Sequence, residues 1–168
     1  GNLTEKILLK NPKKLIIIEK DKTLFQNLKL KFNKFSNLKI LNCDFLKLNL
    51  DKIVKEKMTI VGNLPYNIST KILVKLIKFQ DNNKIFEKLI LMFQKEVADK
   101  IIASNNSKNY GRISIISKYN FNVIRLFNIS NNCFFPKPKV MSSILLFKPK
   151  NNITNKLVEL SSLEKITN

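Results

Sequence analysis

The sequence predicts an α/β fold built on a mostly parallel sheet, with an antiparallel hairpin at one edge. Short apolar runs alternate along the chain with segments whose apolar residues recur at helical spacing. The first run, residues 15–18, is wholly apolar, which is typical of a parallel strand covered on both faces. Two late segments, 121–129 and 141–147, alternate like strands with no convincing helix between them, so we expect them to pair antiparallel.

The remaining elements follow from the same periodicities. Before the hairpin, strands are expected at residues 15–18, 38–41, 58–61 and 89–93. Helices are expected at residues 23–35, 48–57, 68–79, 94–104 and 112–119. Asn67 or Ser69 is expected to cap the helix at 68–79, because both side chains can accept a hydrogen bond from a free backbone N–H. Strand and helix in alternation indicate a doubly wound sheet.

The length and composition favour one domain with a real core. The chain has 168 residues and is 44% hydrophobic. It starts abruptly at Gly1, so we expect a fragment whose domain at residues 1–149 lacks its N-terminal part, including the first strand. Composition turns polar after Pro149. Residues 150–168 are therefore expected to be a linker and the start of a truncated C-terminal helical domain.

The charge points to a polyanionic partner. There are 31 basic and 12 acidic residues, which gives a formal net charge of +19 and a pI near 10.0. A field of that sign attracts nucleic acid and speeds its capture. No apolar run reaches the roughly 18 residues needed to cross a bilayer, and we expect no membrane partner. A lysine-rich surface that merely reflects an AT-rich genome is the alternative.

Cys43 and Cys133 are the two cysteines, and histidine is absent. Two thiols so far apart in sequence form neither a disulfide framework nor a zinc site, so no metal is expected. Both are expected to be buried free thiols in a reducing compartment. With no leader segment visible, a cytoplasmic location is expected, or an organelle if the source is eukaryotic.

The most informative stretch is Asn63-Leu64-Pro65-Tyr66, directly after the third predicted strand. The Asn63 side-chain oxygen and the Leu64 carbonyl can accept the two hydrogens of an amine. Pro65 fixes the backbone and brings no competing N–H. Tyr66 offers a ring on which a planar base can stack. This pattern suits methyl transfer to the exocyclic amine of a nucleobase, whereas the simpler alternative is an ordinary turn.

Acidic residues follow the two earlier strands. Glu19 ends the first, and Asp44 follows the second. Ligands of open α/β sheets bind at the carboxyl ends of the strands. Gly1 lies 18 residues before Glu19, close to the roughly 20 residues that separate a glycine-rich turn from a ribose-binding acid. Glu19 could therefore accept ribose hydroxyls and Asp44 an adenine amine, although either could simply cap a turn.

Four blocks carry a resemblance to a known family: residues 62–70, 92–97, 107–114 and 134–140. In these blocks the chain resembles the small-subunit ribosomal RNA adenine dimethyltransferases (KsgA type), which are Rossmann-like S-adenosylmethionine-dependent methyltransferases. The resemblance implies dimethylation of two adjacent adenines near the 3′ end of small-subunit rRNA during ribosome biogenesis. It also implies S-adenosylmethionine as cofactor, rRNA or the precursor small subunit as partner, and a monomer.

The resemblance also implies roles for individual residues. The cofactor would be held by Gly1, Glu19, Asp44 and Asn63, with Glu19 on its ribose and Asp44 on its adenine amine. The reaction would use Asn63, Leu64, Pro65, Tyr66 and Phe134, with Tyr66 and Phe134 sandwiching the extruded base. Gly1 matches the tail of the family's glycine-rich motif, whose earlier glycines are absent from this chain.

Two other functions stay open. One is methylation of a large-subunit adenine, as in the sister enzymes that confer macrolide resistance. The other is a non-catalytic nucleic-acid-binding relative, such as a mitochondrial transcription or assembly factor. The runs at 94–97 and 108–114 favour the small-subunit enzymes, and the intact block at 63–66 argues against lost catalysis.

Overall fold

The computed structural model describes residues 1–150, so the predicted linker and C-terminal helix lie outside the described residues. The chain forms two compact units, residues 1–49 and the part from Leu50 onward. The predicted division into a catalytic domain at 1–149 and a following segment stays a prediction.

The N-terminal unit contains α1 (Asn2–Leu8), β1 (Leu15–Glu19), α2 (Lys22–Lys31) and β2 (Leu38–Asn42). The two strands pair in parallel, with Glu19 opposite Asn42. Asp21 caps α2 by accepting a hydrogen bond from the Leu24 N–H at 2.8 Å. Helix α1 was not predicted, because it is only seven residues long and its N-cap, Gly1, has no side chain to signal a start.

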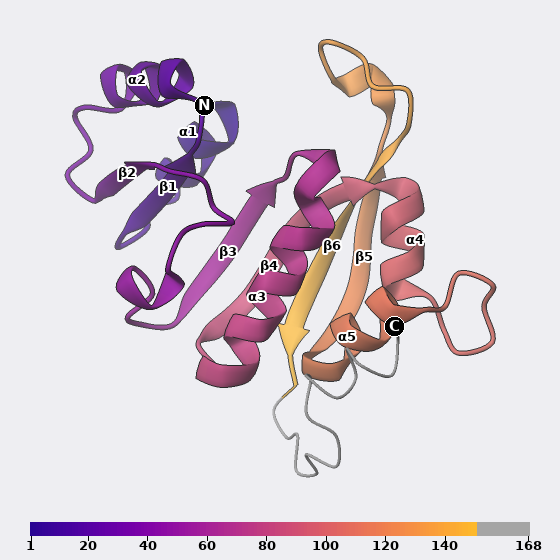
Figure 1. The fold of residues 1–168 in the computed structure, drawn as a ribbon. Helices are drawn as coiled ribbons and strands as arrows, with labels where there is room; N and C mark the ends of the chain where they lie inside the picture. The colour runs from indigo at the N-terminus through magenta and orange to yellow at the C-terminus, as the bar shows by residue number, and fades with distance from the viewer. Residues whose placement is uncertain (151–168) are drawn as a thin grey trace. The chain divides into compact units, whose positions relative to one another are not determined.

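The second unit is a four-stranded sheet with helices packed against it. Its helices are α3 (Ser69–Asn83), α4 (Lys95–Ile102) and α5 (Arg112–Asn120), with 3₁₀ turns η1 (Leu50–Lys52), η2 (Tyr66–Ile68) and η3 (Asn131–Cys133). Its strands are β3 (Met58–Asn63), β4 (Phe86–Gln94), β5 (Phe121–Ile129) and β6 (Ser142–Pro149). They lie in the order β3-β4-β6-β5 (Figure 1). Strands β3 and β4 are parallel, while β6 runs antiparallel to both of its neighbours.

The predicted α/β class is confirmed, as is the antiparallel hairpin at one edge. Within that hairpin β6 lies inside, between β4 and β5, and β5 forms the edge. The helix predicted at 48–57 is wrong, because only a 3₁₀ turn forms there. Leu50 and Val54 are the two buried apolar residues of that segment, too few to anchor a longer helix.

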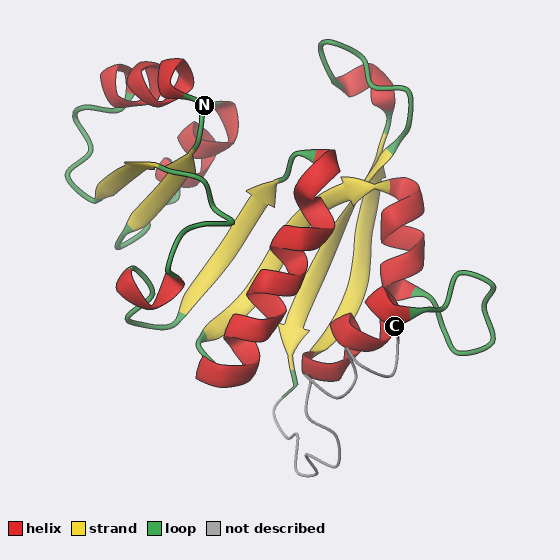
Figure 2. Ribbon diagram, in the orientation of Figure 1, coloured by secondary structure: helices red, strands yellow, loops and turns green. Residues whose placement is uncertain are grey.

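The core of the second unit lies between α3 and the sheet. Helix α3 crosses the front of the strands in Figure 2. Its fully buried residues include Leu73, Leu76 and Ile77. Strand β6 contributes Phe147, whose ring meets those of Phe93 and Phe121 edge-on at centroid distances of 6.3 and 5.9 Å. This packing fixes the strand ends from which the candidate site is built.

Three sequence expectations concern chemistry away from the core. Both cysteines are free, but Cys43 is only half-buried and Cys133 is exposed, so the predicted burial of both is wrong. Cys133 ends the turn η3 in the connection between β5 and β6, where little packs on it. Among residues 1–150 no three acidic, Cys or His side chains gather as a metal site. None of the helices described there is long and apolar enough to span a bilayer.

Candidate active site

Gly62 shapes the exit from β3. A Cβ atom at this position would lie 2.7 Å from Leu64 Cδ2 and 2.9 Å from Leu91 Cδ2, well inside contact distance. The absence of a side chain therefore lets Leu64 fold back against β4. Asn63, the last residue of β3, lies opposite Met92 of β4. This register places the Asn63 amide at the carboxyl edge of the two parallel strands.

Two hydrogen bonds hold the turn that follows. The Ile68 N–H donates to the Pro65 carbonyl at 3.1 Å. The Ser69 hydroxyl donates to the Tyr66 carbonyl at 3.0 Å. The predicted side-chain cap on α3 is wrong, because Ile68 occupies the N-cap and Ser69 is already inside the helix. The Ser69 hydroxyl thus stabilises the preceding turn through Tyr66, and it does not accept a hydrogen bond from a backbone N–H of the helix.

Tyr66 is also held by its hydroxyl. Its Oη atom lies 2.6 Å from Ser142 Oγ. Ser142 is fully buried at the start of β6, opposite Gln94 of β4. The half-buried Tyr66 ring is therefore fixed at its backbone and at its far end, so that it presents a constant face. Sequence reasoning missed Ser142, whose signal is a pair of serines opening an otherwise apolar strand.

The two acceptor groups of the turn remain available. Asn63 is exposed. Within the described chain, no hydrogen bond engages its side chain or the Leu64 carbonyl. An incoming amine therefore need not displace an existing partner. The structure thus brings Asn63, Leu64, Pro65 and Tyr66 together as one rigid turn with free oxygen atoms.

Phe134 lies in the connection between β5 and β6. Its N–H donates to the Asn131 carbonyl at 3.3 Å, and the Asn131 side chain donates to the Pro138 carbonyl at 3.3 Å. Because β6 is antiparallel to β4, this connection leaves and re-enters the sheet at the edge where β3 ends (Figure 1). Phe134 is half-buried, whereas the neighbouring Phe135 is fully exposed. Topology therefore brings the Phe134 segment to the same edge as Asn63.

In the N-terminal unit, Glu19 and Asp44 share one edge of the β1–β2 pair. Glu19 Oε1 accepts from the Asp21 N–H at 2.9 Å, and the Cys43 N–H donates to the Glu19 carbonyl at 3.2 Å. Asp44 Oδ2 pairs with Lys20 Nζ at 3.0 Å. The two carboxylates therefore lie on adjacent strand ends, as the sequence predicts.

Asp44 is set up as an ionised acceptor. The hydrogen bond from Lys20 lowers the pKa of its carboxyl below the usual value, and the bond from the Leu46 N–H to Oδ1, 2.9 Å long, adds to the effect. Gly1 is the N-cap of α1, and a Cβ there would meet Leu28 of α2 and Phe32, the C-cap residue of that helix, at 3.4 Å. That the carboxylates of the first unit and the Asn63 turn of the second meet in one cleft stays a prediction.

Asp99 forms a network that sequence reasoning missed. It accepts from Lys95 Nζ at 3.0 Å and from the Arg125 guanidinium of β5. Burial of Asp99 by itself would raise the pKa of this carboxyl, but the bonds from Lys95 and Arg125 outweigh it and hold the pKa below the usual value. The network links α4 to the edge strand β5. The sequence alone shows only that Lys95 and Asp99 are four residues apart.

The α/β fold that the sequence predicts is present, with the parallel strands β3 and β4 ending at the turn that carries Asn63. The family model described as "Ribosomal RNA adenine dimethylase" matches residues 1–168. The chain therefore belongs to the ribosomal RNA adenine dimethylase family.

Individual relatives agree with this assignment. The chain is 50% identical over 167 residues to "Ribosomal RNA small subunit methyltransferase A" of Pelagibacter ubique, covering 99% of this chain and 63% of that protein. A Wolbachia protein of the same name is 38% identical over 168 residues, covering 99% and 60%. The chain thus spans about three fifths of the length of these curated relatives.

Solved structures show the same fold. A dimethyladenosine transferase from Plasmodium falciparum matches with a TM-score of 0.83 and 30% identity, over 99% of this chain and 58% of that one. The 23S rRNA methyltransferase ErmE matches with a TM-score of 0.67 over 90% of this chain and 57% of that one. At 24% identity, the second likeness shows the fold alone.

Proposed function

We propose that the protein dimethylates two adjacent adenines near the 3′ end of small-subunit rRNA, with S-adenosylmethionine as the methyl donor. The observation that carries this proposal is the turn at the end of β3. There, two oxygen atoms of Asn63 and Leu64, unengaged within the described chain, stand beside a tyrosine ring anchored to Ser142 at 2.6 Å. The names of the curated relatives support the small subunit as the substrate.

The acceptor amine needs help that this turn can give. An adenine amine delocalises its lone pair into the ring and is a poor nucleophile. Hydrogen bonds from its two hydrogens to the Asn63 side-chain oxygen and the Leu64 carbonyl favour a pyramidal nitrogen with a directed lone pair. This is catalysis by positioning and electrostatic stabilisation. No strong general base is required, because the methylated cation loses its proton readily.

The cofactor would be held by the carboxylates of the first unit. Glu19 uses one oxygen on the Asp21 N–H, and its carboxylate retains further acceptor capacity for ribose hydroxyls. Asp44, with its lowered pKa, offers an ionised oxygen to the adenine amine. Gly1, at the N-cap of α1, would face the cofactor. When bound, S-adenosylmethionine supplies a methyl group already activated on a sulfonium.

The target base must leave its stack to reach the turn, which costs least in single-stranded or loop RNA. Tyr66 and Phe134 would sandwich the extruded adenine, since both come to the carboxyl edge of the sheet. The basic surface, with its net charge of +19, would hold the phosphates. We place the protein in the cytoplasm, acting as a monomer on the precursor small subunit.

The deciding experiment is a methylation assay on purified small and large ribosomal subunits, with labelled S-adenosylmethionine and the full-length protein. Label on two adjacent small-subunit adenines is the expected result. Label confined to large-subunit RNA would identify the macrolide-resistance type of enzyme instead. Absence of label from both, with binding retained, would identify a non-catalytic RNA-binding protein.

A further inference from the structure

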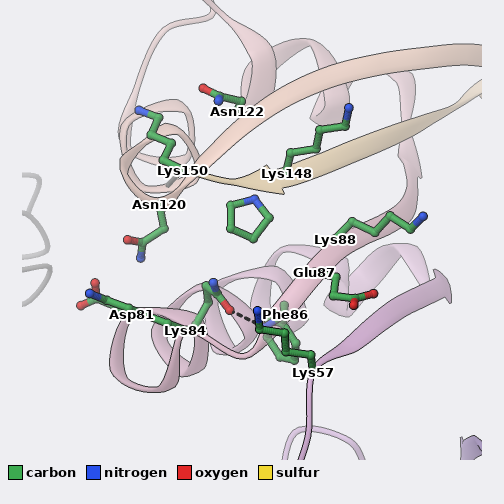
Figure 3. A pocket seen from close by; sticks show the side chains of 12 residues that line it. Lys57, Asp81, Lys84, Phe86, Glu87, Lys88, Asn120, Asn122, Lys148 and Lys150 are labelled. Carbon is green, nitrogen blue, oxygen red and sulfur yellow. Dashed lines mark hydrogen bonds between the residues drawn. The ribbon is translucent and has the colours of Figure 1, made fainter. Parts of the chain in front are cut away.

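A recess lies at the opposite end of the sheet from Asn63. It has a volume of about 650 Å³ and opens where β4 begins and where α3, α5 and β6 end (Figure 3). From Met58, beside the recess, to Asn63 at the site, β3 takes five steps of roughly 3.3 Å, or about 17 Å. A ligand in this recess would therefore not touch the base held at the turn.

Positive charge dominates the lining. The basic residues are Lys57, Lys84, Lys88, Lys148 and Lys150, and the acidic ones are Asp81 and Glu87. Five ammonium groups against two carboxylates leave a formal charge of +3. All five lysines are exposed, and none forms an ion pair with another residue of the described chain.

The two helices that end here do not cancel this charge. The C-terminus of an α-helix carries about half a negative charge, so α3 and α5 together contribute about one. A net positive charge of about two remains over the recess. Part of the lysine charge neutralises the partial negative charge of the two helix C-termini, and the remainder is available to an external anion.

The wall of the recess holds an unused donor. Asn120, the last residue of α5, is only 3% exposed, and its Nδ2 atom has no hydrogen-bond partner in the part of the chain that the structure describes. In Figure 3 its side chain points toward the end of α3, on the side where Asp81 lies. Beside it, Gln80 uses its Oε1 on the Phe86 N–H at 2.8 Å. A buried donor without a partner is costly, and an acceptor oxygen from a ligand would relieve it.

Lys84 adds a further sign of ligand binding. It ends α3 with φ 50°, in the left-handed region where glycine or asparagine is favoured. A lysine at this position serves the backbone poorly, yet it brings an ammonium group to the mouth of the recess. Its ammonium group suits the negative end of α3 and is also placed where an anion in the recess could reach it.

We propose that this recess binds phosphate groups of the RNA backbone, forming a second RNA-binding surface remote from methyl transfer. The inference rests on the proposed function, because it assumes an RNA substrate. Given the length of β3, we place these phosphates on nucleotides other than the extruded base and its immediate neighbours. The recess would then help the protein select a folded RNA over a short one.

The test compares two variants that lose the same charge. The first carries Lys84→Gln, Lys88→Gln and Lys148→Gln in the recess. The control carries Lys10→Gln, Lys13→Gln and Lys14→Gln in the N-terminal unit, also exposed lysines. Binding of each full-length protein to naked small-subunit rRNA, to whole small subunits and to a short target-loop RNA is measured over a series of salt concentrations.

We expect the recess variant to bind naked rRNA about tenfold or more weakly, with a salt slope reduced by about one for each phosphate that it no longer binds. Its affinity for the short RNA should equal that of the control. The inference is overturned if both variants lose affinity equally, if neither does, or if the loss occurs with whole subunits but not with naked rRNA, which would indicate a protein partner.

The readout separates this inference from the proposed function. Binding is measured without methyl transfer. If the wild type is inactive but the recess variant still binds RNA more weakly than the wild type, only the proposed function is refuted. If the wild type is fully active but the recess variant binds RNA as tightly as the control variant, only the proposed RNA-binding role of the recess is refuted. Asn120→Asp gives a second variant, expected to weaken binding by placing a carboxylate in the wall, with thermal unfolding as a check on folding.

Discussion

The hydroxyl of Tyr66 lies 2.6 Å from the hydroxyl of Ser142, which joins the turn after β3 to the first residue of β6. The two residues are 76 positions apart in sequence. This bond makes Ser142 a positioning residue for the stacking ring under the proposed function, and it leads to the first prediction.

Ser142→Ala should lower kcat about five- to tenfold with little change in KM, because a hydrogen bond of this kind contributes about 1 kcal/mol. Tyr66→Phe should have a similar effect, and the double variant should be no worse than either single one. Ser143→Ala is the control, since Ser143 is equally buried but donates to Asn128 instead. Equal slowing by the control would mean that only packing is involved.

Asn63→Ala should reduce turnover by about 10²-fold or more while RNA affinity hardly changes, because the amide acts on the reacting amine. Single-turnover methylation and a separate RNA-binding measurement check the two parts. Asn67→Ala, at another exposed asparagine of the same turn, should leave both unchanged. A large loss of RNA affinity in Asn63→Ala would show that the turn is a docking element.

Gly62→Ala should destabilise the protein by about 1–3 kcal/mol, because the new methyl would meet Leu64 and Leu91 at 2.7 and 2.9 Å. Denaturant unfolding measures the effect. Gly111→Ala is the matched control, since a Cβ there has nothing within 4 Å. Its cost should be smaller and limited to the loss of an N-cap glycine. Equal costs would argue against a tight exit from β3.

Lys84→Gly should stabilise the protein by about 1 kcal/mol, because glycine adopts φ 50° without strain. Lys84→Ala removes the same charge but keeps the strain, so its stability should not increase. Thermal unfolding of both variants separates the backbone effect from the charge effect. A gain in both would assign the stabilisation to relief of repulsion among the lysines.

Asp99 should give a pH-dependent contribution to stability. Its pKa is lower in the folded chain than in the unfolded chain, so its stabilising effect is present above its unfolded pKa, about 3.9, and is lost as pH falls through the lower folded pKa. Asp99→Asn should therefore be destabilised at pH 7, and the difference from wild type should shrink below about pH 4.

The control for that pH series is Glu96→Gln, an exposed acid on the same helix. At pH 7 it should lose less stability than Asp99→Asn, because it gives up only a negative charge in the first turn of α4 and no ion pair between elements. If it reproduces the Asp99→Asn profile, the effect comes from the net charge of α4 and not from the bonds to Lys95 and Arg125.

Much of the fold could be predicted because it is encoded locally. Strand ends at Glu19, Asp44 and Asn63 follow short apolar runs, and the structure places the first two on adjacent strand ends and the third at the edge of β3 and β4. Helix α1 and the turn η1 could not be predicted well. Short segments without a capping side chain or a full apolar stripe give no periodic signal.

The sequence by itself determined the alternating elements, the rigid Asn63–Tyr66 turn and the family to which the chain belongs. Only the tertiary structure decided that Ser142 holds Tyr66, that Arg125 reaches Asp99, and that five lysines line the same recess as an Asn120 donor with no partner among residues 1–150. The physical reason is the separation along the chain of the residues that make these contacts. Periodicity reflects neighbours a few residues apart, whereas these contacts depend on the strand order β3-β4-β6-β5, which joins segments far apart along the chain.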